Sequence, residues 1–286
     1  MIKFRNRGRL GATFVALLAT TLLAPAAPAQ AAANPQRVQI VSPANATSPK
    51  IVTVACGGTD VLVGMGANVV DGQGEVLLTR LVPDLTTDSV TATAVEDTPV
   101  NTPWELVVWG ICVPAAQAPL NLQLVSNSAA ASVGFFKGVD VTCPGTTQTY
   151  GIGYALSAGF GQVAIDEVRY EPALKIGSVD AYTYNGFGGS WGLDTHVICG
   201  EPAPNMTLTQ WTSAVNPISP KTESTPVCGG TTQVHGVGGW VNGALGNAAI
   251  ATLNPRPQLT TAEITVRETG PYNNPWSVTV QAVCAD

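Results

Sequence analysis

The run Cys56–Gly66, CGGTDVLVGMG, returns twice further along the chain, as CPGTTQTYGIG at Cys143–Gly153 and as CGGTTQVHGVG at Cys228–Gly238. Each copy has a threonine three residues after the cysteine and glycines eight and ten residues after it. A second cysteine follows 56 residues after each first one, and a tryptophan stands eight residues before it. These are Trp104 with Cys112, Trp191 with Cys199, and Trp276 with Cys284. Three gapless matches of this length indicate an internal repeat of about 85 residues.

The six cysteines are predicted to form one disulfide within each repeat. The constant spacing favours the pairs Cys56–Cys112, Cys143–Cys199 and Cys228–Cys284 over the many other pairings that six cysteines allow. Closing a loop of this length contributes about 4 kcal/mol in the chain-entropy model. Structural zinc fits less well, because the chain has no C-x-x-C pair and no histidine that recurs beside the cysteines. The disulfides predict an oxidising compartment outside the cell.

Between these markers the sequence predicts short β-strands. Apolar and polar residues alternate over short runs bounded by Gly, Pro and Asn, which is typical of half-buried strands. In each strand that ends at a second cysteine, Trp and Cys share one face, which we expect to be the core. The opposite face carries polar residues that suit solvent: Glu105, Asp194, His196, Ser277, Thr279 and Gln281. The recurring G-x-G is expected to leave room for the disulfide or the tryptophan.

The predicted fold class is all-β, with three tandem homologous antiparallel β-sandwich-like repeats. They cover residues 34–115, 116–202 and 203–286. The alternative is a single pseudo-threefold β-prism or barrel in which the repeats share one core. An immunoglobulin domain is not indicated, because the tryptophan precedes the second cysteine by eight residues and no tyrosine stands two residues before that cysteine.

Residues 1–33 have the layout of a cleaved export signal. Four Lys and Arg residues precede the uncharged apolar run Leu10–Leu23, and Ala29–Ala31 has the pattern of a signal-peptidase site. We therefore expect a secreted, extracellular protein with no membrane span in its mature form. The chain has 13 Lys and Arg and 19 Asp and Glu, so loss of the four basic signal residues changes the formal charge from −6 to −10. This charge argues against nucleic acid as a partner.

The pattern K-x-V-x-V-x-C-x-G-T, G-x-G, V-x-L, V-x-A-x-E and W-x-L followed by Cys runs through the whole mature chain. It resembles a repeat found in uncharacterised secreted proteins of actinobacteria. The resemblance implies export and disulfide bonds, and it implies no activity, cofactor or ligand site. Repeat 2 departs from the pattern, because Thr183 stands where the other repeats have Glu96 and Glu268.

No recurring set of residues predicts catalysis, so we expect a protein that is not an enzyme and has no cofactor. The chain has no G-x-S-x-G, no H-E-x-x-H and no phosphate-binding loop. Asp194 and His196 share an outward face, so a secreted hydrolase that uses them is a less favoured hypothesis. The acidic residues Asp166, Glu167 and Glu171 could serve a glycosidase, but no pattern around them indicates a cleft. No metal is expected either, because the acidic run 71–75 lacks the spacing of a calcium loop.

Aromatic residues concentrate in repeat 2. Two of its tyrosines alternate with expected core residues and are therefore predicted on an outer face, followed by a turn that adds Asn and Phe. Exposed tyrosines beside Asn and Asp can stack on a sugar or contact a protein. The predicted ligand site comprises Tyr182, Tyr184, Asn185, Phe187, Asp194 and His196. We expect a non-catalytic protein that binds a glycan or a protein at the cell surface; the alternative is a structural, self-associating envelope protein.

Overall fold

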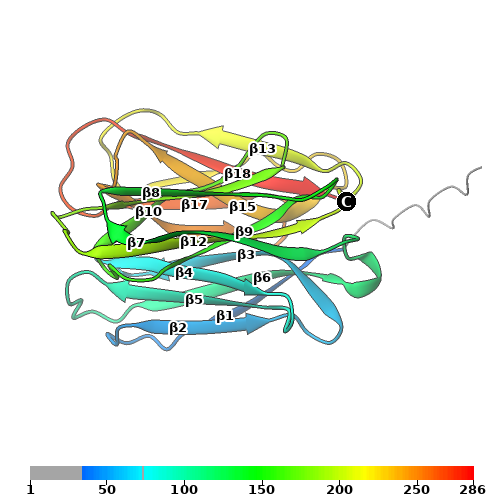
Figure 1. The fold of residues 1–286 in the computed structure, drawn as a ribbon, viewed down its shortest axis with the longest axis horizontal. Helices are drawn as coiled ribbons and strands as arrows, with labels where there is room; N and C mark the ends of the chain where they lie inside the picture. Colours follow the sequence, from blue (N-terminus) through cyan, green and yellow to red (C-terminus); the bar gives the residue numbers. More distant parts are fainter. Residues whose placement is uncertain (1–33, 73) are drawn as a thin grey trace, which may run out of the picture.

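The computed structural model describes residues 34–72 and 74–286, and the predicted export signal lies outside them (Figure 1). The described elements are β-strands and one 3₁₀ turn, Ala115–Gln117. Repeat 1 has β1 (Gln36–Val41), β2 (Lys50–Ala55), β3 (Asp60–Val70), β4 (Val76–Asp84), β5 (Ser89–Glu96) and β6 (Glu105–Pro114). Repeat 2 has β7 (Gln123–Val133), β8 (Phe136–Thr142), β9 (Gln148–Leu156), β10 (Val163–Tyr170), β11 (Ile176–Thr183) and β12 (Ser190–Gly200). Repeat 3 has β13 (Thr207–Thr212), β14 (Lys221–Ser224), β15 (Gln233–Asn242), β16 (Ala248–Pro255), β17 (Ala262–Glu268) and β18 (Ser277–Ala285).

Each repeat folds into two three-stranded antiparallel sheets. In repeat 1 their strand orders are β1-β6-β3 and β2-β5-β4, and repeats 2 and 3 have the same arrangement. The disulfide Cys56–Cys112 joins the end of β2 to β6 and so links the two sheets; the equivalent disulfides Cys143–Cys199 and Cys228–Cys284 are also present. The structure therefore confirms an all-β fold of three sandwich-like repeats and the predicted disulfides.

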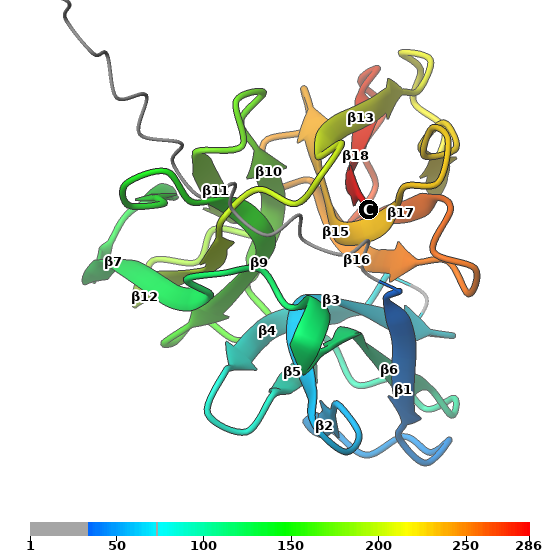
Figure 2. The ribbon, with the colours of Figure 1, turned by 90° about the vertical axis from the view of Figure 1, so that its right-hand side faces the viewer.

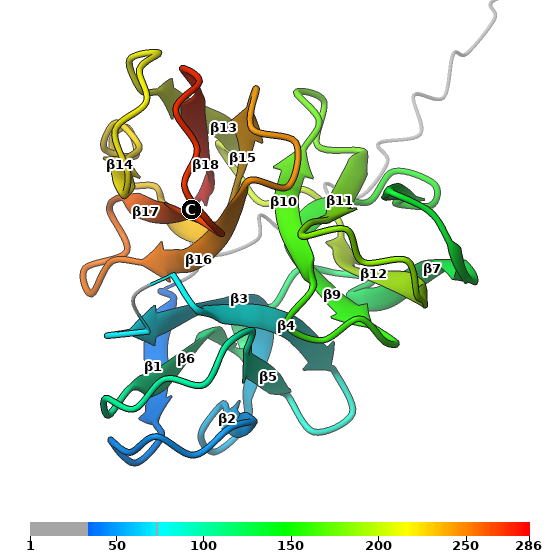
Figure 3. The same ribbon diagram turned by 90° about the vertical axis from the view of Figure 1, so that its left-hand side faces the viewer.

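The three repeats share their sheets. Strand β3 pairs with β16, β4 with β9, and β10 with β15, so that three six-stranded sheets form and each belongs to two repeats. Figures 2 and 3 show the repeats arranged as a ring around a common centre. None of these sheets closes into a barrel. One cluster of buried apolar residues extends through all three repeats. The three sandwich-like units agree with the predicted tandem repeats. The core that they share agrees with the pseudo-threefold alternative.

The G-x-G motifs lie where the repeats meet. A Cβ atom on the first glycine of each motif would lie 1.9–3.0 Å from a backbone carbonyl oxygen of another repeat. The pairs are Gly64 with His235, Gly151 with Val63, and Gly236 with Tyr150. Each of these carbonyls belongs to the residue just before a motif glycine, so the contacts run around the ring. The glycines therefore admit a neighbouring backbone, and the expectation that they make room for the disulfide or the tryptophan is wrong.

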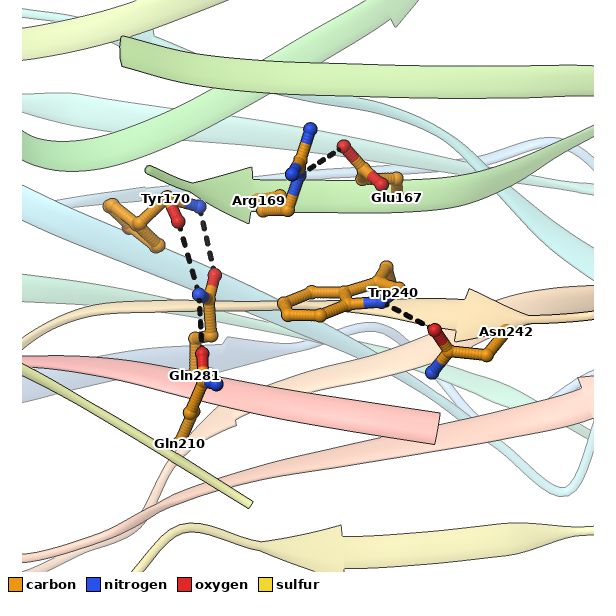
Figure 4. A network of polar contacts seen from close by, with 7 residues as sticks. All are labelled: Glu167, Arg169, Tyr170, Gln210, Trp240, Asn242 and Gln281. Atoms are coloured by element: carbon orange, nitrogen blue, oxygen red, sulfur yellow. Dashed lines mark hydrogen bonds and ion pairs between the residues drawn. The ribbon is translucent and has the colours of Figure 1, made fainter. Parts of the chain in front are cut away.

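Of the strands that carry the second cysteines, β18 is buried on both faces, whereas Glu105 of β6 and Asp194 and His196 of β12 are partly exposed. Trp104, Trp191 and Trp276 are fully buried, as expected for the core face. The opposite face of β18 is also buried, which corrects the expectation that Ser277, Thr279 and Gln281 face solvent. Gln281 accepts a hydrogen bond from the Tyr170 amide and donates one to the Tyr170 carbonyl, across the junction with repeat 2 (Figure 4). In the described parts of the chain, no helix is long and apolar enough to cross a membrane.

Candidate functional site

The surroundings of the buried tryptophan differ in repeat 2. In the other repeats the indole donates to a glutamate, Trp104 to Glu96 at 2.8 Å and Trp276 to Glu268 at 3.3 Å. In repeat 2 the glutamate is replaced by Thr183, and Trp191 Nε1 instead donates to the carbonyl oxygen of Gly134 at 2.8 Å. The departure from the repeat pattern therefore brings the backbone at Gly134 to the place that a carboxylate occupies elsewhere.

A shortened connection supplies this backbone. Strands β1 and β2 are joined by residues 42–49, and β13 and β14 by residues 213–220, but β7 and β8 are joined by residues 134–135 alone. In the long connections, an asparagine receives hydrogen bonds from the lysine that begins the next strand, Lys50 to Asn45 and Lys221 to Asn216. In repeat 2, Lys137 makes the equivalent hydrogen bonds to Ala130 and Ser132, which lie within the longer strand β7. The short connection presents Phe135 at the surface, where its side chain is 57% exposed.

Phe135 belongs to an exposed cluster of three aromatic rings. The Tyr182 ring lies edge-on to Phe135, with a centroid distance of 5.4 Å, and tilted against Phe136 at 4.8 Å. Both phenylalanines are substantially exposed, and Tyr182 is half-buried. We call Phe135, Phe136 and Tyr182 the aromatic cluster. Its rings combine an apolar surface with one phenolic hydroxyl, the composition that suits stacking against a sugar ring.

The turn after β11 places Asn185 beside this cluster. Asn185 and Gly186 have φ values of 52° and 71°, and the Phe187 amide donates to the Tyr184 carbonyl at 3.1 Å. Two consecutive positive φ values are the requirement of a type I′ turn, which Asn-Gly meets most readily. The turn leaves Asn185 exposed and Phe187 half-buried.

Tyr184 is buried, so the expectation that its ring faces outward is wrong. Its side chain is 7% exposed and packs against Leu77, Ala164 and Ala249, one residue from each repeat. Its hydroxyl donates to the carbonyl oxygen of Gly161. Burial raises the pKa of the phenol well above its ordinary value. Alternation along the strand predicts the same face for Tyr182 and Tyr184, but neighbouring repeats bury the Tyr184 side chain and leave Tyr182 half-buried.

A cavity of about 420 Å³ opens between the short connection, the Asn-Gly turn and a loop of repeat 3. We call it the repeat-2 pocket. Its lining consists of Val133, Gly134, Phe135, Thr183, Tyr184, Asn185, Gly186, Phe187, Leu245 and Asn247. Three of the predicted site residues, Tyr184, Asn185 and Phe187, are brought together here, and Tyr182 adjoins the pocket through its contact with Phe135. No deletion in the sequence marks Phe135, because the connection is short where β7, with 11 residues, is longer than β1 and β13, with 6 each. No local signal points to Leu245 or Asn247 either.

Asp194 and His196 do not line this pocket. They lie on β12, opposite Ser128 and Ser126 of β7, and His196 Nδ1 forms a hydrogen bond with Ser126 Oγ at 2.8 Å. Burial is the main cause that lowers the pKa of His196. The same cross-strand position holds hydrogen-bonded polar pairs in the other repeats, Trp109 with Gln39 and Gln281 with Gln210. The contact of His196 with Ser126 thus has structural equivalents throughout the ring.

A group of carboxyl groups lies on the outer face of the sheet that repeats 2 and 3 share. Asp166 occupies a β-bulge of β10, next to Glu167, which lies directly opposite Asp180 of β11. Burial raises the pKa of Asp166 to about 8 and that of Asp180 to about 6, and nearby carboxylates add to both shifts. Glu167 forms an ion pair with Arg169 at 2.6 Å, next to Trp240 (Figure 4). The sequence pattern singles out Asp166 and Glu167 but does not place Asp180 beside them.

Within residues 34–72 and 74–286, no group of three or more His, Cys, Asp or Glu side chains has an arrangement that could hold a metal ion. No protein-family model matches this chain, and no curated protein is similar to it in sequence.

Proposed function

We propose that this chain is a secreted, non-catalytic binding protein that takes a carbohydrate through the repeat-2 pocket and the aromatic cluster. The observation that carries the proposal is the exposed Phe135 ring at the wall of a cavity of about 420 Å³. Repeat 3 contributes Leu245 and Asn247 to the lining. The equivalent cavity of repeat 3, of about 400 Å³, is lined by Glu75, Ser219, Pro220, Arg267, Glu268, Gly270 and Pro271, so no aromatic ring among the described residues lines it.

The lining of the pocket supports a sugar as ligand. Aromatic rings stack on the apolar faces of sugar rings, and amide groups both donate and accept hydrogen bonds with hydroxyl groups. Phe135 and Phe187 offer the rings, and Asn185 and Asn247 offer the amides, from three separate chain segments. Binding sites for small molecules commonly combine apolar walls with a few placed polar groups of this kind.

The expected location agrees with this role. The N-terminal pattern is that of an export signal. Three disulfides closed within the repeats fit an oxidising compartment, in which extracellular polysaccharides are accessible.

The test of the proposal is binding of the mature protein to a panel of oligosaccharides and cell-wall polysaccharides. We expect saturable binding of at least one glycan, and we expect Phe135→Ser to weaken it about fivefold or more, because stacking on one ring contributes about 1 kcal/mol or more. The melting temperature should change by only a few degrees, because the ring is already 57% exposed.

The matched control is Trp211→Ser. Trp211 is also an exposed aromatic residue, 53% accessible, but it lies on β13, at the opposite edge of the same six-stranded sheet from β8. Glycan binding should be unchanged in this variant. Equal losses in the two variants, or no saturable glycan binding by the parent protein, would contradict the proposal; self-association without glycan binding would favour the structural alternative.

A further inference from the structure

Repeat 2 carries acidic residues at positions where its sister repeats have none. The directly opposed pair Glu167 and Asp180 corresponds to Arg80 and Thr93 in repeat 1 and to Thr252 and Thr265 in repeat 3. The bulge residue Asp166 corresponds to Thr79 and Ala251. Like charges placed directly opposite each other destabilise a sheet. The fold forms twice without these carboxyl groups, so it does not need them.

The carboxyl group of Asp166 lacks a complete set of hydrogen-bond partners. Its side chain is 6% exposed, the backbone of Gly246 forms a hydrogen bond to its carboxyl group, and its Oδ1 atom has no hydrogen-bond partner. Its electrostatic interactions with Glu167 and Asp180 are repulsive and place it within the same group of charges. A buried polar atom without a partner is rare in proteins and indicates a role beyond packing.

Positive charge near these groups is scarce. Arg169 pairs with Glu167, and it is the only basic side chain that forms an ion pair with any of the three acids in the described residues. Lys137, on the neighbouring strand β8, donates instead to Ala130 and Ser132 and lies 5.2 Å from the Trp191 ring. Asp166 therefore has no ion-pair partner among the described residues, and Asp180 shares the charge of Arg169 with Glu167.

The acidic group adjoins the repeat-2 pocket. Gly246, which hydrogen-bonds to Asp166, stands between the pocket residues Leu245 and Asn247. A Cβ atom at Gly246 would lie 2.7 Å from Cβ of Tyr182, so this loop rests directly on the tyrosine of the aromatic cluster. One side of Tyr182 thus faces the pocket wall at Phe135, and its hydroxyl interacts electrostatically with Asp166, Asp180 and Glu167.

We propose that the carbohydrate bound at the repeat-2 pocket carries free amino groups, and that Asp180 and Glu167 bind its ammonium groups beside the aromatic cluster, with Asp166 buried next to them. This inference rests on the proposed function and names the chemical class of its ligand. An ammonium group brings one positive charge and three hydrogen-bond donors, which the carboxyl oxygens can accept. The partial burial of the acids strengthens the attraction over that in water. Acidic glycans are repelled by the same group.

The probes for the test are the β-1,4-linked glucosamine tetramer, with free amino groups, and its fully N-acetylated counterpart, which is neutral. We expect the amino form to bind about tenfold tighter or more at low salt near pH 6.5, and its advantage to shrink as ionic strength rises. Binding should also release protons, because a bound cation lowers the pKa of Asp166 and Asp180 from about 8 and about 6. Titration calorimetry in two buffers of different ionisation enthalpy measures both the affinity for each tetramer and the number of protons released on binding.

Asp180→Asn is the diagnostic variant, because it removes a charge without changing the shape of the side chain. It should abolish most of the preference for the amino form and leave binding of the neutral form unchanged. Asp60→Asn, which removes one charge from repeat 1, is the matched control and should behave like the parent protein. Equal affinity for both tetramers, or a preference that survives Asp180→Asn, would overturn the inference while leaving the proposed function intact. Failure of every glycan to bind would overturn both.

Discussion

Gly64→Ala is expected to destabilise the fold by about 3 kcal/mol or more, although it adds a single methyl group. The new Cβ atom would lie 1.9 Å from the carbonyl oxygen of His235 and 3.1 Å from the Ile111 side chain. The carbonyl belongs to β15 of repeat 3, and a backbone cannot turn aside as a flexible side chain can. Relief of the clash requires the two repeats to move apart at the centre of the ring, which opens their shared core.

Gly57→Ala is the control for this substitution. Gly57 precedes Gly64 by seven residues in the same repeat, and a Cβ atom there would meet nothing within 4 Å. The free energy of unfolding, measured by urea denaturation with the disulfides intact, should fall sharply for Gly64→Ala and stay within about 0.5 kcal/mol of the parent for Gly57→Ala. Similar stability of the two variants would show that the repeats do not meet through these glycines.

Asp166→Thr is expected to stabilise the protein by about 2–5 kcal/mol at pH 8 and to have little effect at pH 4. Burial raises the pKa of Asp166 from 3.8 to about 8. Between these two values the folded state holds a proton that the unfolded state has lost, so the stability of the parent protein falls as pH rises through this window. Below pH 4 the carboxyl group is neutral in both states, and above pH 8 it is ionised in both.

Threonine is the suitable replacement because repeat 1 has it at this bulge. Thr79 is fully buried, and its hydroxyl donates to the Thr93 carbonyl oxygen at 3.3 Å. Asp166→Ala, which introduces the residue type that Ala251 has at this bulge in repeat 3, gives a second variant without a hydroxyl. Urea unfolding at pH 4 and pH 8 measures the difference in each case. A gain that is equal at both pH values, or a loss of stability at pH 8, would show that Asp166 is not a buried acid held in its neutral form.

The candidate site could be predicted only in part. The aromatic content of repeat 2 and its departure at Thr183 predict a site in this repeat, and Asn185 and Phe187 line the repeat-2 pocket. Alternation along β11 could not reveal that Tyr184 is covered, because the Leu77, Ala164 and Ala249 side chains that bury it come from three different repeats. The role of Asn185 and Phe187 in ligand binding stays a prediction, as does that of Asp194 and His196.

The sequence by itself determined the repeat, its strands and its disulfides. Constant spacing and alternation act over short distances, and a cysteine pair at a fixed interval defines a loop whatever surrounds it. Only the tertiary structure decided how the repeats join. Asn68 and Thr252 meet across β3 and β16 although 184 residues separate them. That junction depends on complementary strand edges and on glycines that allow two backbones to approach closely. The local sequence of a strand does not reveal which distant strand it will pair with.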